Sequence, residues 1–331
     1  MRKFLRITAI IILVLLIAYF IGPRPAKAVY ASSLPTIPAD VEQFVLKQEA
    51  SHKLKTDNEA RIIWVDSSKR KTNFSIVYLH GFSASQEEGD PVHIATAKKF
   101  GCNLYLSRLA EHGIDTIDPL KNLTVEKYWE SAKQALQIGK QLGRRVIIMG
   151  TSTGASLALK IAAEFPRDVY GLVLLSPNIK LFDENAYLLN NPWGLQIARM
   201  ILKSNYIDSK DQRPIYKQYW NSHYPIEAVV QLEEFLETGM TEETFKKVTQ
   251  PTLMLYYFKD KVHQDSVVNV LAMTKMFDQL GTAGHLKRAV NIPTAGNHVL
   301  GSPLKSKDVE SVMREVDAFM TELLRLQRKE P

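Results

Sequence analysis

A G-x-S-x-G motif occupies residues 150–154, and the serine at its centre, Ser152, could act as a nucleophile. An apolar, β-branched run at 145–149 precedes it and an amphipathic stretch at 155–163 follows, which predicts a buried strand, a sharp turn and a helix. Glycines on both sides let the backbone turn tightly and lift the serine oxygen above the sheet, at the positive end of the following helix. This pattern is typical of a nucleophilic serine that performs acyl transfer.

A serine nucleophile needs a general base, and His298 is the best candidate. It follows the last expected strand, 287–292, in a loop whose glycine and asparagine make it mobile enough to bring an imidazole onto the serine. Histidine suits the task because its pKa lies near working pH. His263 and His285 are alternatives, but neither lies in the loop after the final strand.

The base in turn needs an acid that orients it, and the sequence offers two. Asp260 follows the expected buried strand 252–258 at its carboxyl end, where an α/β sheet gathers its chemistry. We predict that Asp260 holds the imidazole in the right tautomer and stabilises its charged form. Asp265 competes for this role but lies further into the loop before the expected helix 267–280.

An oxyanion hole is predicted from two backbone N–H groups. Gly81 directly follows the strand-like run 74–79 and His80, and a glycine there lets the backbone approach a ligand closely. In acyl-transfer enzymes such a loop supplies one donor, and the residue after the nucleophile supplies the other. The candidates are therefore the N–H groups of Phe82 and Thr153. His112 also neighbours a glycine, but it lies upstream of the nucleophile, so we predict a structural role for it.

These residues require a sheet of mostly parallel strands with helices between them. Strand-like and helix-like segments alternate along the chain, which predicts a doubly wound α/β fold. The expected strands are 62–65, 74–79, a run around 104, 145–149, 169–177, 252–258 and 287–292, and the expected helices are 92–100, 125–142, 155–163, 267–280 and 307–326. The single cysteine, Cys102, excludes an internal disulfide and is predicted to be a buried thiol.

Residues from about 179 to 250 break this alternation and are predicted to form a cap. They carry helical periodicity and are placed between two core strands, above the edge where the candidate site lies. An apolar roof over a serine nucleophile favours acyl substrates over sugars and phosphates. Its aromatic residues are Phe182, Tyr187, Trp193, Tyr206, Tyr216, Tyr219, Trp220 and Tyr224.

The N-terminus is predicted to be a targeting or anchoring segment, residues 1–28. Three basic residues precede an apolar run at 7–21, which is on the border between a signal peptide and a short membrane span. Cleavage after Ala28 would release the chain, but two more positive charges just beyond the apolar run favour an uncleaved anchor. The charge in front of the run predicts that the remainder lies outside the cytoplasm. Residues 29–60 are interpreted as a tether and a leading helix, and 61–331 as the main domain.

The charge balance argues against nucleic acid as a partner. The formal net charge is +7, but five basic residues and no acidic ones lie in the first 28 positions. The rest of the chain has 37 basic and 35 acidic residues and is close to neutral.

The order Ser152, Asp260, His298, each after its own strand, resembles that of the α/β-hydrolase superfamily over about residues 61–326. The segments 78–82 and 106–113 look most like the carboxylesterase and monoacylglycerol-lipase branch. This resemblance implies hydrolysis of small lipid or acyl esters through an acyl-serine intermediate, with no cofactor and no metal. Thr153 stands where methionine or glutamine is commoner, and the cap is larger than in the simplest esterases, which leaves the substrate open.

Two other functions stay open. A proline-releasing aminopeptidase on the same scaffold would need a polar cap site for a free amine. The cap acids Glu233, Glu234, Glu237, Glu242 and Glu243 could supply it, although we predict a solvated helix face. A non-catalytic binding module is disfavoured by the intact set of three residues.

Overall fold

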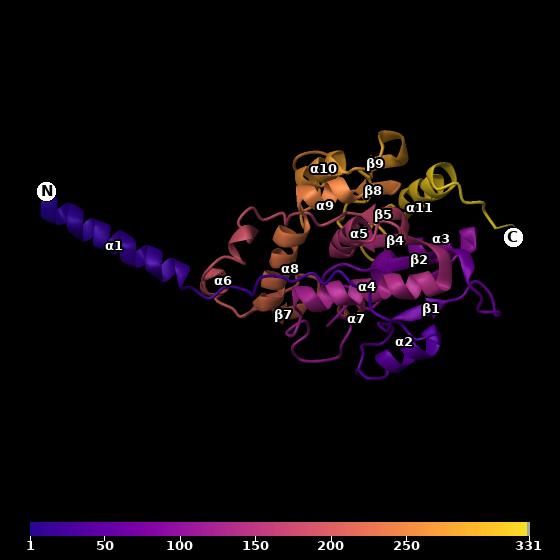
Figure 1. Ribbon diagram of the computed structural model, residues 1–331, viewed down its shortest axis with the longest axis horizontal. Coiled ribbons are helices and arrows are strands. Elements are labelled where there is room, and N and C mark those ends of the chain that lie inside the picture. The colour runs from indigo at the N-terminus through magenta and orange to yellow at the C-terminus, as the bar shows by residue number, and fades with distance from the viewer. Residues whose placement is uncertain (330–331) are drawn as a thin grey trace.

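The computed structural model describes residues 1–329, and a seven-stranded sheet forms its centre (Figure 1). The strand order is β1-β3-β2-β4-β5-β8-β9, and every neighbouring pair is parallel except the edge pair β1 and β3. This arrangement confirms the predicted doubly wound fold. The strands are β1 (Arg61–Ile63), β2 (Thr72–Leu79), β3 (Asn103–Leu106), β4 (Gly143–Thr151), β5 (Val169–Leu175), β8 (Thr252–Tyr256) and β9 (Lys287–Asn291).

Alternate residues of the central strands enter two separate cores, because successive strand side chains point to opposite faces. In β4, Val146 and Ile148 pack against α4 (Val125–Leu142), α5 (Thr153–Glu164) and α10 (Val270–Gln279). Ile147 and Met149 pack on the other face, against α3 (Val92–Phe100) and α11 (Val309–Ala318). Both faces of the sheet are therefore buried from solvent, which explains why the strand sequences are continuous apolar runs. Cys102 is buried as predicted, and burial raises the pKa of its thiol to about 12.

The insertion between β5 and β8 forms the cap, but it is not wholly helical. Two short antiparallel strands, β6 (Tyr206–Asp208) and β7 (His223–Pro225), make a ribbon between its helices. The last part of the insertion belongs to the main core, since Phe235 and Phe245 pack in the same cluster as α4 and α5. The cap helices are α6 (Gly194–Leu202), α7 (Pro214–Tyr219), α8 (Ile226–Gly239) and α9 (Glu242–Lys247).

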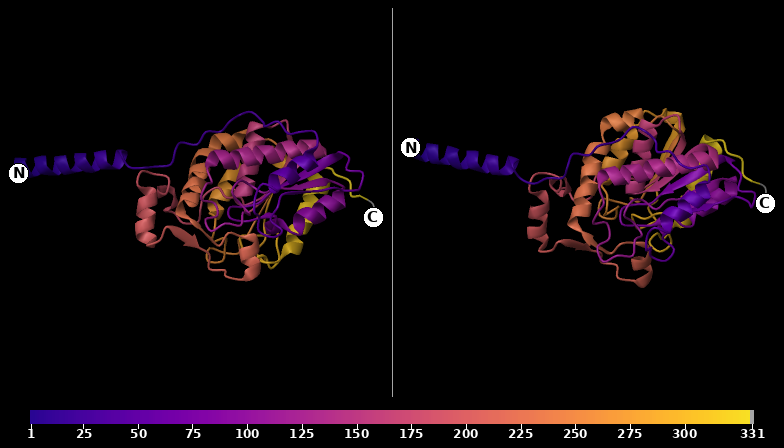
Figure 2. Two further views of the ribbon diagram at one scale, coloured as in Figure 1. Left: turned by 90° about the horizontal axis from the view of Figure 1, so that it is seen from below. Right: turned by 60° about the horizontal axis from the view of Figure 1, so that its bottom comes forward.

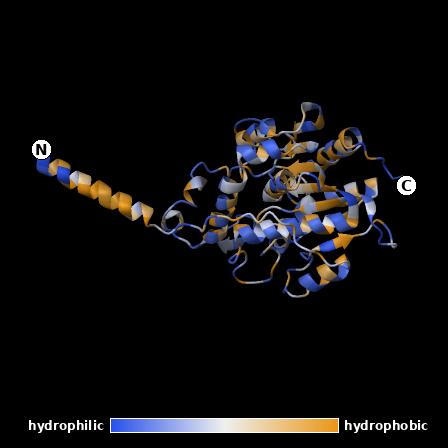
Figure 3. Ribbon diagram, viewed as in Figure 1, coloured by the Kyte–Doolittle hydropathy of each residue, from blue (hydrophilic) through white to orange (hydrophobic). Residues whose placement is uncertain are grey.

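Helix α1 (Arg2–Phe20) extends away from the domain (Figures 1 and 2). None of its residues is buried, and its surface is almost continuously apolar after the first turn (Figure 3). Nineteen residues span about 28 Å, close to the thickness of a bilayer core. The helix is long and apolar enough to cross a membrane, and a signal sequence would have the same properties.

The predicted tether is not a free linker. Residues 28–38, which we call the strap, run in extended form along α4 and are held there by hydrogen bonds. Four α4 side chains spaced four apart donate to strap carbonyls spaced two apart. Four helical residues and two extended ones both advance about 6 Å, so the two repeats stay in register. The pairs are Trp129 with Ala31, Lys133 with Ala31 and Ser33, Gln137 with Pro35, and Gln141 with Ile37 and Pro38. Helix α2 (Val41–Glu49) follows the strap.

Candidate active site

Ser152 lies in the turn from β4 to α5, as the motif predicts. Its backbone has φ 54° and ψ −122°, a conformation that costs free energy for a residue with a side chain. Both neighbouring glycines are required. A Cβ atom at Gly154 would lie 2.0 Å from Leu79 O, and one at Gly150 would lie 2.7 Å from the Gly154 and Ala155 backbone. These close backbone contacts allow the chain to turn sharply at Ser152, which lies between the end of β4 and the start of α5.

The loop that carries His298 adjoins this turn at the end of β5. Ser152 N–H donates to Leu175 O at 2.9 Å. The next residue, Ser176, donates its hydroxyl to His298 O at 2.7 Å. His298 is buried, and its Nε2 has no hydrogen-bond partner among the described residues, so this nitrogen is available to a nucleophile or a substrate.

The acid bound to His298 is Asp265, and the prediction of Asp260 for this role is wrong. Asp265 Oδ2 lies 2.6 Å from His298 Nδ1, and its side chain is fully buried. Its Oδ1 accepts the N–H groups of Val267 and Val268 at 2.8 and 3.1 Å. Burial alone would lower the pKa of His298, but the Asp265 carboxylate and, more weakly, Glu88 together raise that pKa above its ordinary value.

Asp260 lies at the tip of a small hairpin instead. Residues 258–264 fold back on themselves, with a bridge between Phe258 and Gln264, so Asp265 N–H donates to Tyr257 O. In space, Asp265 is thus the residue at the end of β8. Asp260 is 49% exposed and accepts the N–H groups of the turn and the ring nitrogen of His263, which lower its pKa to about 2.

The loop after β2 holds the predicted oxyanion donor Phe82 between two anchored neighbours. Gly81 N–H donates to Glu88 Oε2 at 2.6 Å, and Ser83 N–H donates to His112 Nε2 at 3.0 Å. His112 is buried, and burial holds its pKa well below the ordinary value, so it is a neutral acceptor. Its predicted structural role is consistent with this contact.

Glu88 is a buried site residue that the sequence analysis missed. A Cβ atom at Gly81 would lie 2.9 Å from Glu88 Oε2 and 3.0 Å from Ser152 Cβ, so the carboxyl group and the nucleophile flank the same glycine. Burial raises the pKa of Glu88 to about 7, against the opposing effects of His298 and the Gly81 N–H. An acidic pair, Glu87-Glu88, has no feature in the sequence that separates it from a solvated turn.

The cap closes over this site. Trp220 packs with Ala84 of the Phe82 loop and Val299, the residue after His298. Asn221 N–H donates to Ser83 O at 2.7 Å, which joins the cap to the same loop. Only 6% of Ser152 is exposed.

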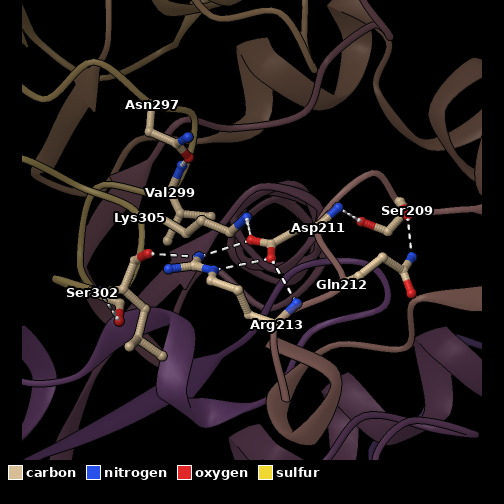
Figure 4. A network of polar contacts seen from close by, with 9 residues as sticks. Ser209, Asp211, Gln212, Arg213, Asn297, Val299, Ser302 and Lys305 are labelled. Atoms are coloured by element: carbon tan, nitrogen blue, oxygen red, sulfur yellow. Dashed lines mark hydrogen bonds and ion pairs between the residues drawn. The ribbon is translucent and has the colours of Figure 1, made fainter. Parts of the chain in front are cut away.

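An ion-pair cluster joins the cap to the segment after His298 (Figure 4). Asp211, in the segment between β6 and α7, accepts from Lys305 at 2.7 Å and from Arg213 at 2.7 and 3.0 Å. Arg213 also donates to Leu304 O at 3.1 Å. The Lys305 ammonium lies 4.1 Å from the centre of the Tyr216 ring. We call Asp211, Arg213 and Lys305 the latch.

The solvated face predicted for the five cap acids holds for Glu237, Glu242 and Glu243, which are exposed, but not for the other two. Glu233 and Glu234 of α8 are both buried, and burial raises the pKa of Glu233 to about 7. Glu234 binds Ala28 N–H at 3.1 Å and the Asn190 side chain at 3.1 Å. This residue therefore fixes the start of the strap.

Comparison with solved structures supports the fold assignment. No family model matches the chain, and no curated protein matches it significantly in sequence. A structure of the metagenome-derived lipolytic enzymes LipS and LipT matches 82% of this chain and all of its own, with TM-score 0.64 and 16% identity. Est1E from Butyrivibrio proteoclasticus, with ferulic acid bound, covers 81% of this chain and 95% of its own, at TM-score 0.56 and 18% identity.

The monoacylglycerol lipase of Paleococcus ferrophilus covers 78% of this chain and 95% of its own, at TM-score 0.57 and 12% identity. Similarity at such low identity shows the fold. The chain has the α/β-hydrolase fold, and the solved structures that it resembles include lipases and esterases.

Proposed function

We propose that the protein is a serine hydrolase that cleaves carboxylic esters through an acyl-serine intermediate. The observation that carries this proposal is the buried pair of His298 and Asp265, whose imidazole keeps Nε2 free beside the strained turn of Ser152. Resemblance to lipases and esterases supports the same reaction class.

In the first half-reaction, Ser152 Oγ attacks the ester carbonyl while His298 Nε2 takes the hydroxyl proton. The Asp265 carboxylate stabilises the imidazolium that forms. The N–H groups of Phe82 and Thr153 are the proposed donors to the tetrahedral oxyanion, at the loop and at the helix start. The intermediate then collapses, and His298 returns the proton to the departing alcohol.

In the second half-reaction, water replaces the alcohol. His298 Nε2 removes a proton from the water, and the hydroxide attacks the acyl carbonyl. Collapse of this intermediate releases the carboxylic acid, and the proton returns to Ser152. The enzyme ends in its starting state without a cofactor.

The proposed substrates are small lipid or acyl esters. The side chains that cover the site are aromatic or aliphatic, notably Trp220 and Val299, and Phe82 packs edge-on against Tyr224. Apolar walls stabilise acyl groups by about 0.8 kcal/mol per buried methylene. Turnover should therefore rise roughly fourfold per added carbon until the pocket is full.

We further propose that α1 stays attached as a single-pass anchor with the catalytic domain outside the cytoplasm. Cleavage near Ala28 and release of the domain is the alternative. The N-terminal mass of protein from the host's membrane and soluble fractions distinguishes the two.

The central experiment is to label the protein with a fluorophosphonate and measure hydrolysis of aryl esters of increasing acyl length, with aminoacyl amides beside them. Ser152→Ala should abolish labelling and lower ester turnover by about a million-fold. Ser68→Ala, at an exposed serine in the β1–β2 loop, is the control and should match the parent. Full activity in Ser152→Ala would refute the mechanism, and a profile that peaks at aminoacyl amides would favour the aminopeptidase.

A further inference from the structure

Helix α6 of the cap presents its apolar stripe to solvent. Trp193, Ile197, Met200 and Ile201 follow one another at intervals of four, three and one, the spacing of one helix face. They are 38%, 44%, 71% and 70% exposed. In a soluble domain such a stripe faces the core. We call these four residues the α6 stripe.

The orientation of α6 is fixed by its other side. Arg199 pairs with Glu227 of α8 at 2.5 Å. Leu195 and Gln196 line a groove with Val230 and Gln231 of α8. Because polar and half-buried residues face the domain, Ile197, Met200 and Ile201 are left exposed to solvent.

The stripe begins where α1 ends. Trp193 Nε1 donates to Ala18 O in the last turn of α1 at 2.8 Å, and Trp193 N–H donates to Pro23 O at 2.9 Å. The indole also packs on Gly22, where a Cβ atom would lie 2.2 Å from the ring nitrogen. Figures 1 and 2 both place α6 at the point where the candidate membrane helix joins the domain.

The connection to the rest of the domain has little slack. Ala28 N–H is bound by Glu234, and from there the strap is held along α4. Only a short segment separates the end of α1 from this fixed point. A domain on a long flexible tether could turn any face to the membrane, whereas this one is attached on the side that carries α6.

The charges around the stripe suit a phospholipid surface. Lys203 directly follows α6, and Arg24 and Lys27 lie in the segment between α1 and the strap. All three are exposed. Basic side chains near the membrane surface are attracted to anionic headgroups, and their aliphatic portions pack along apolar surface.

We propose that α6 docks on the lipid bilayer, with the α6 stripe at the boundary between headgroups and acyl chains. This inference rests on the proposed uncleaved anchor and adds a second membrane contact to it. The helix lies in the plane of the surface while α1 crosses it. The cap beside the proposed active site is then itself in contact with the lipid that would supply acyl esters.

The test uses the full chain in vesicles of equal parts phosphatidylcholine and phosphatidylglycerol, with intact mass confirming that α1 is present. A spin label is placed at Met200→Cys, or at the control position Leu46→Cys, which is 58% exposed on α2. Native Cys102 is buried and does not compete. The label at 200 should be accessible to oxygen and protected from a water-soluble nickel complex. The label at 46 should be accessible to the nickel complex and less accessible to oxygen.

A water-exposed label at 200 on a chain that retains α1 overturns docking while leaving the anchor intact. Protection from both reagents that depends on protein concentration indicates a second copy of the chain and also overturns it. Loss of α1 from the membrane-isolated protein refutes the anchor first.

A functional measurement supplements the label. Ile201→Asp places a charge on the exposed stripe, at a residue outside the proposed catalytic set. It should lower kcat/KM on an ester held in the vesicle by about tenfold and leave a soluble short-chain ester unchanged. Leu46→Asp is the matched control and should change neither. Equal losses on both substrates would contradict docking, since the effect of the charge would then not depend on the lipid surface.

Discussion

Asp265 holds His298 through a 2.6 Å contact between Oδ2 and Nδ1, and both side chains are buried. The remaining carboxylate oxygen is bound by the two N–H groups of Val267 and Val268. The carboxylate is thus fixed on both sides before it meets the imidazole. A proton on Nδ1 is stabilised there, which leaves Nε2 as the basic nitrogen of the ring.

Replacing Asp265 and Asp260 by asparagine, one at a time, should distinguish their roles. Asp265→Asn removes the charge and favours the wrong tautomer, so kcat/KM for an aryl ester should fall about ten-thousand-fold. In Asp260→Asn, kcat/KM should fall by less than about threefold, because the Asp260 carboxylate binds only its own exposed turn. Circular dichroism checks that both variants fold. A larger loss in Asp260→Asn would mean that the hairpin rearranges to bring Asp260 to His298.

The confusion between these acids has a physical cause. Linear distance from β8 favoured Asp260, and the sequence does not reveal that residues 258–264 form a closed hairpin that returns the chain to the strand end. The succession of strand and helix segments along the chain and the position of Ser152 in its turn were predictable because they depend on local patterns. A pair such as His298 and Asp265 depends on the path of a loop, which periodicity does not describe.

Burial of polar groups was hardest to predict. Glu88 and Glu234 occur in charged segments that look solvated, yet one lies beside the nucleophile and the other fixes the strap. The strap is rich in proline and small residues, which favours a flexible linker when read alone. Its order comes from α4 side chains about a hundred positions away, and only the folded chain brings these together.

Glu88 should shift the acid limb of the pH–rate profile, which the His298 pKa sets. Activity needs neutral His298, so kcat/KM should rise with pH through the His298 pKa. The Asp265 carboxylate raises that pKa, and ionised Glu88 adds to it. Glu88→Gln keeps an acceptor for Gly81 N–H but removes the charge, so the acid limb should move to lower pH.

The matched control is Glu87→Gln. Burial also raises the pKa of Glu87 to about 7, but this side chain binds Ser302. The acid limb of the Glu87→Gln profile should lie at the same pH as that of the parent. Equal shifts in the two variants would assign the effect to general charge rather than to Glu88.

Glu88 also predicts a pH dependence of stability. Its folded pKa is raised from 4.5 to about 7, so the folded chain binds this proton more tightly than the unfolded chain. The contribution is complete below about pH 4.5 and is lost as the pH rises through about 7. Thermal melts of parent and Glu88→Gln should therefore diverge with rising pH, with the variant losing less stability. Parallel melting curves at every pH would contradict a buried, titrating Glu88.

The latch should control how often the cap opens. Asp211→Asn removes both ion pairs with little change in shape, so amide hydrogen exchange across residues 206–222 should quicken a few-fold. Exchange in α4 should not change. Added salt should quicken the same segment in the parent and have little effect in the variant, because partly exposed ion pairs are screened. A uniform change over the whole chain would indicate general destabilisation instead of a latch.

The strap should contribute to the stability of the catalytic domain. Lys133 is buried and donates to Ala31 O at 3.0 Å and Ser33 O at 2.6 Å. Lys133→Met keeps the apolar stem but removes both strap hydrogen bonds and the ion pair with the half-exposed Glu130, which together should cost about 2 kcal/mol. For a domain of about 300 residues Tm should fall by about 3 °C. Lys140→Met is the control on the same helix, where a half-exposed pair with Asp168 should change Tm by about 1–2 °C at most.

Two truncations extend this comparison to the backbone. Removal of residues 1–28 keeps the strap from Val29 onward with its α4 contacts and loses, of the strap's hydrogen bonds, only the Ala28–Glu234 one, so it should leave a soluble domain with Tm and ester turnover close to those of the parent. Removal of residues 1–39 deletes the strap, leaves the α4 donors and Trp129 without their carbonyl partners, and should lower Tm by more than Lys133→Met does. If both truncations melt together with the parent, the strap lies on α4 without stabilising it, and the chain before α2 acts only as a tether.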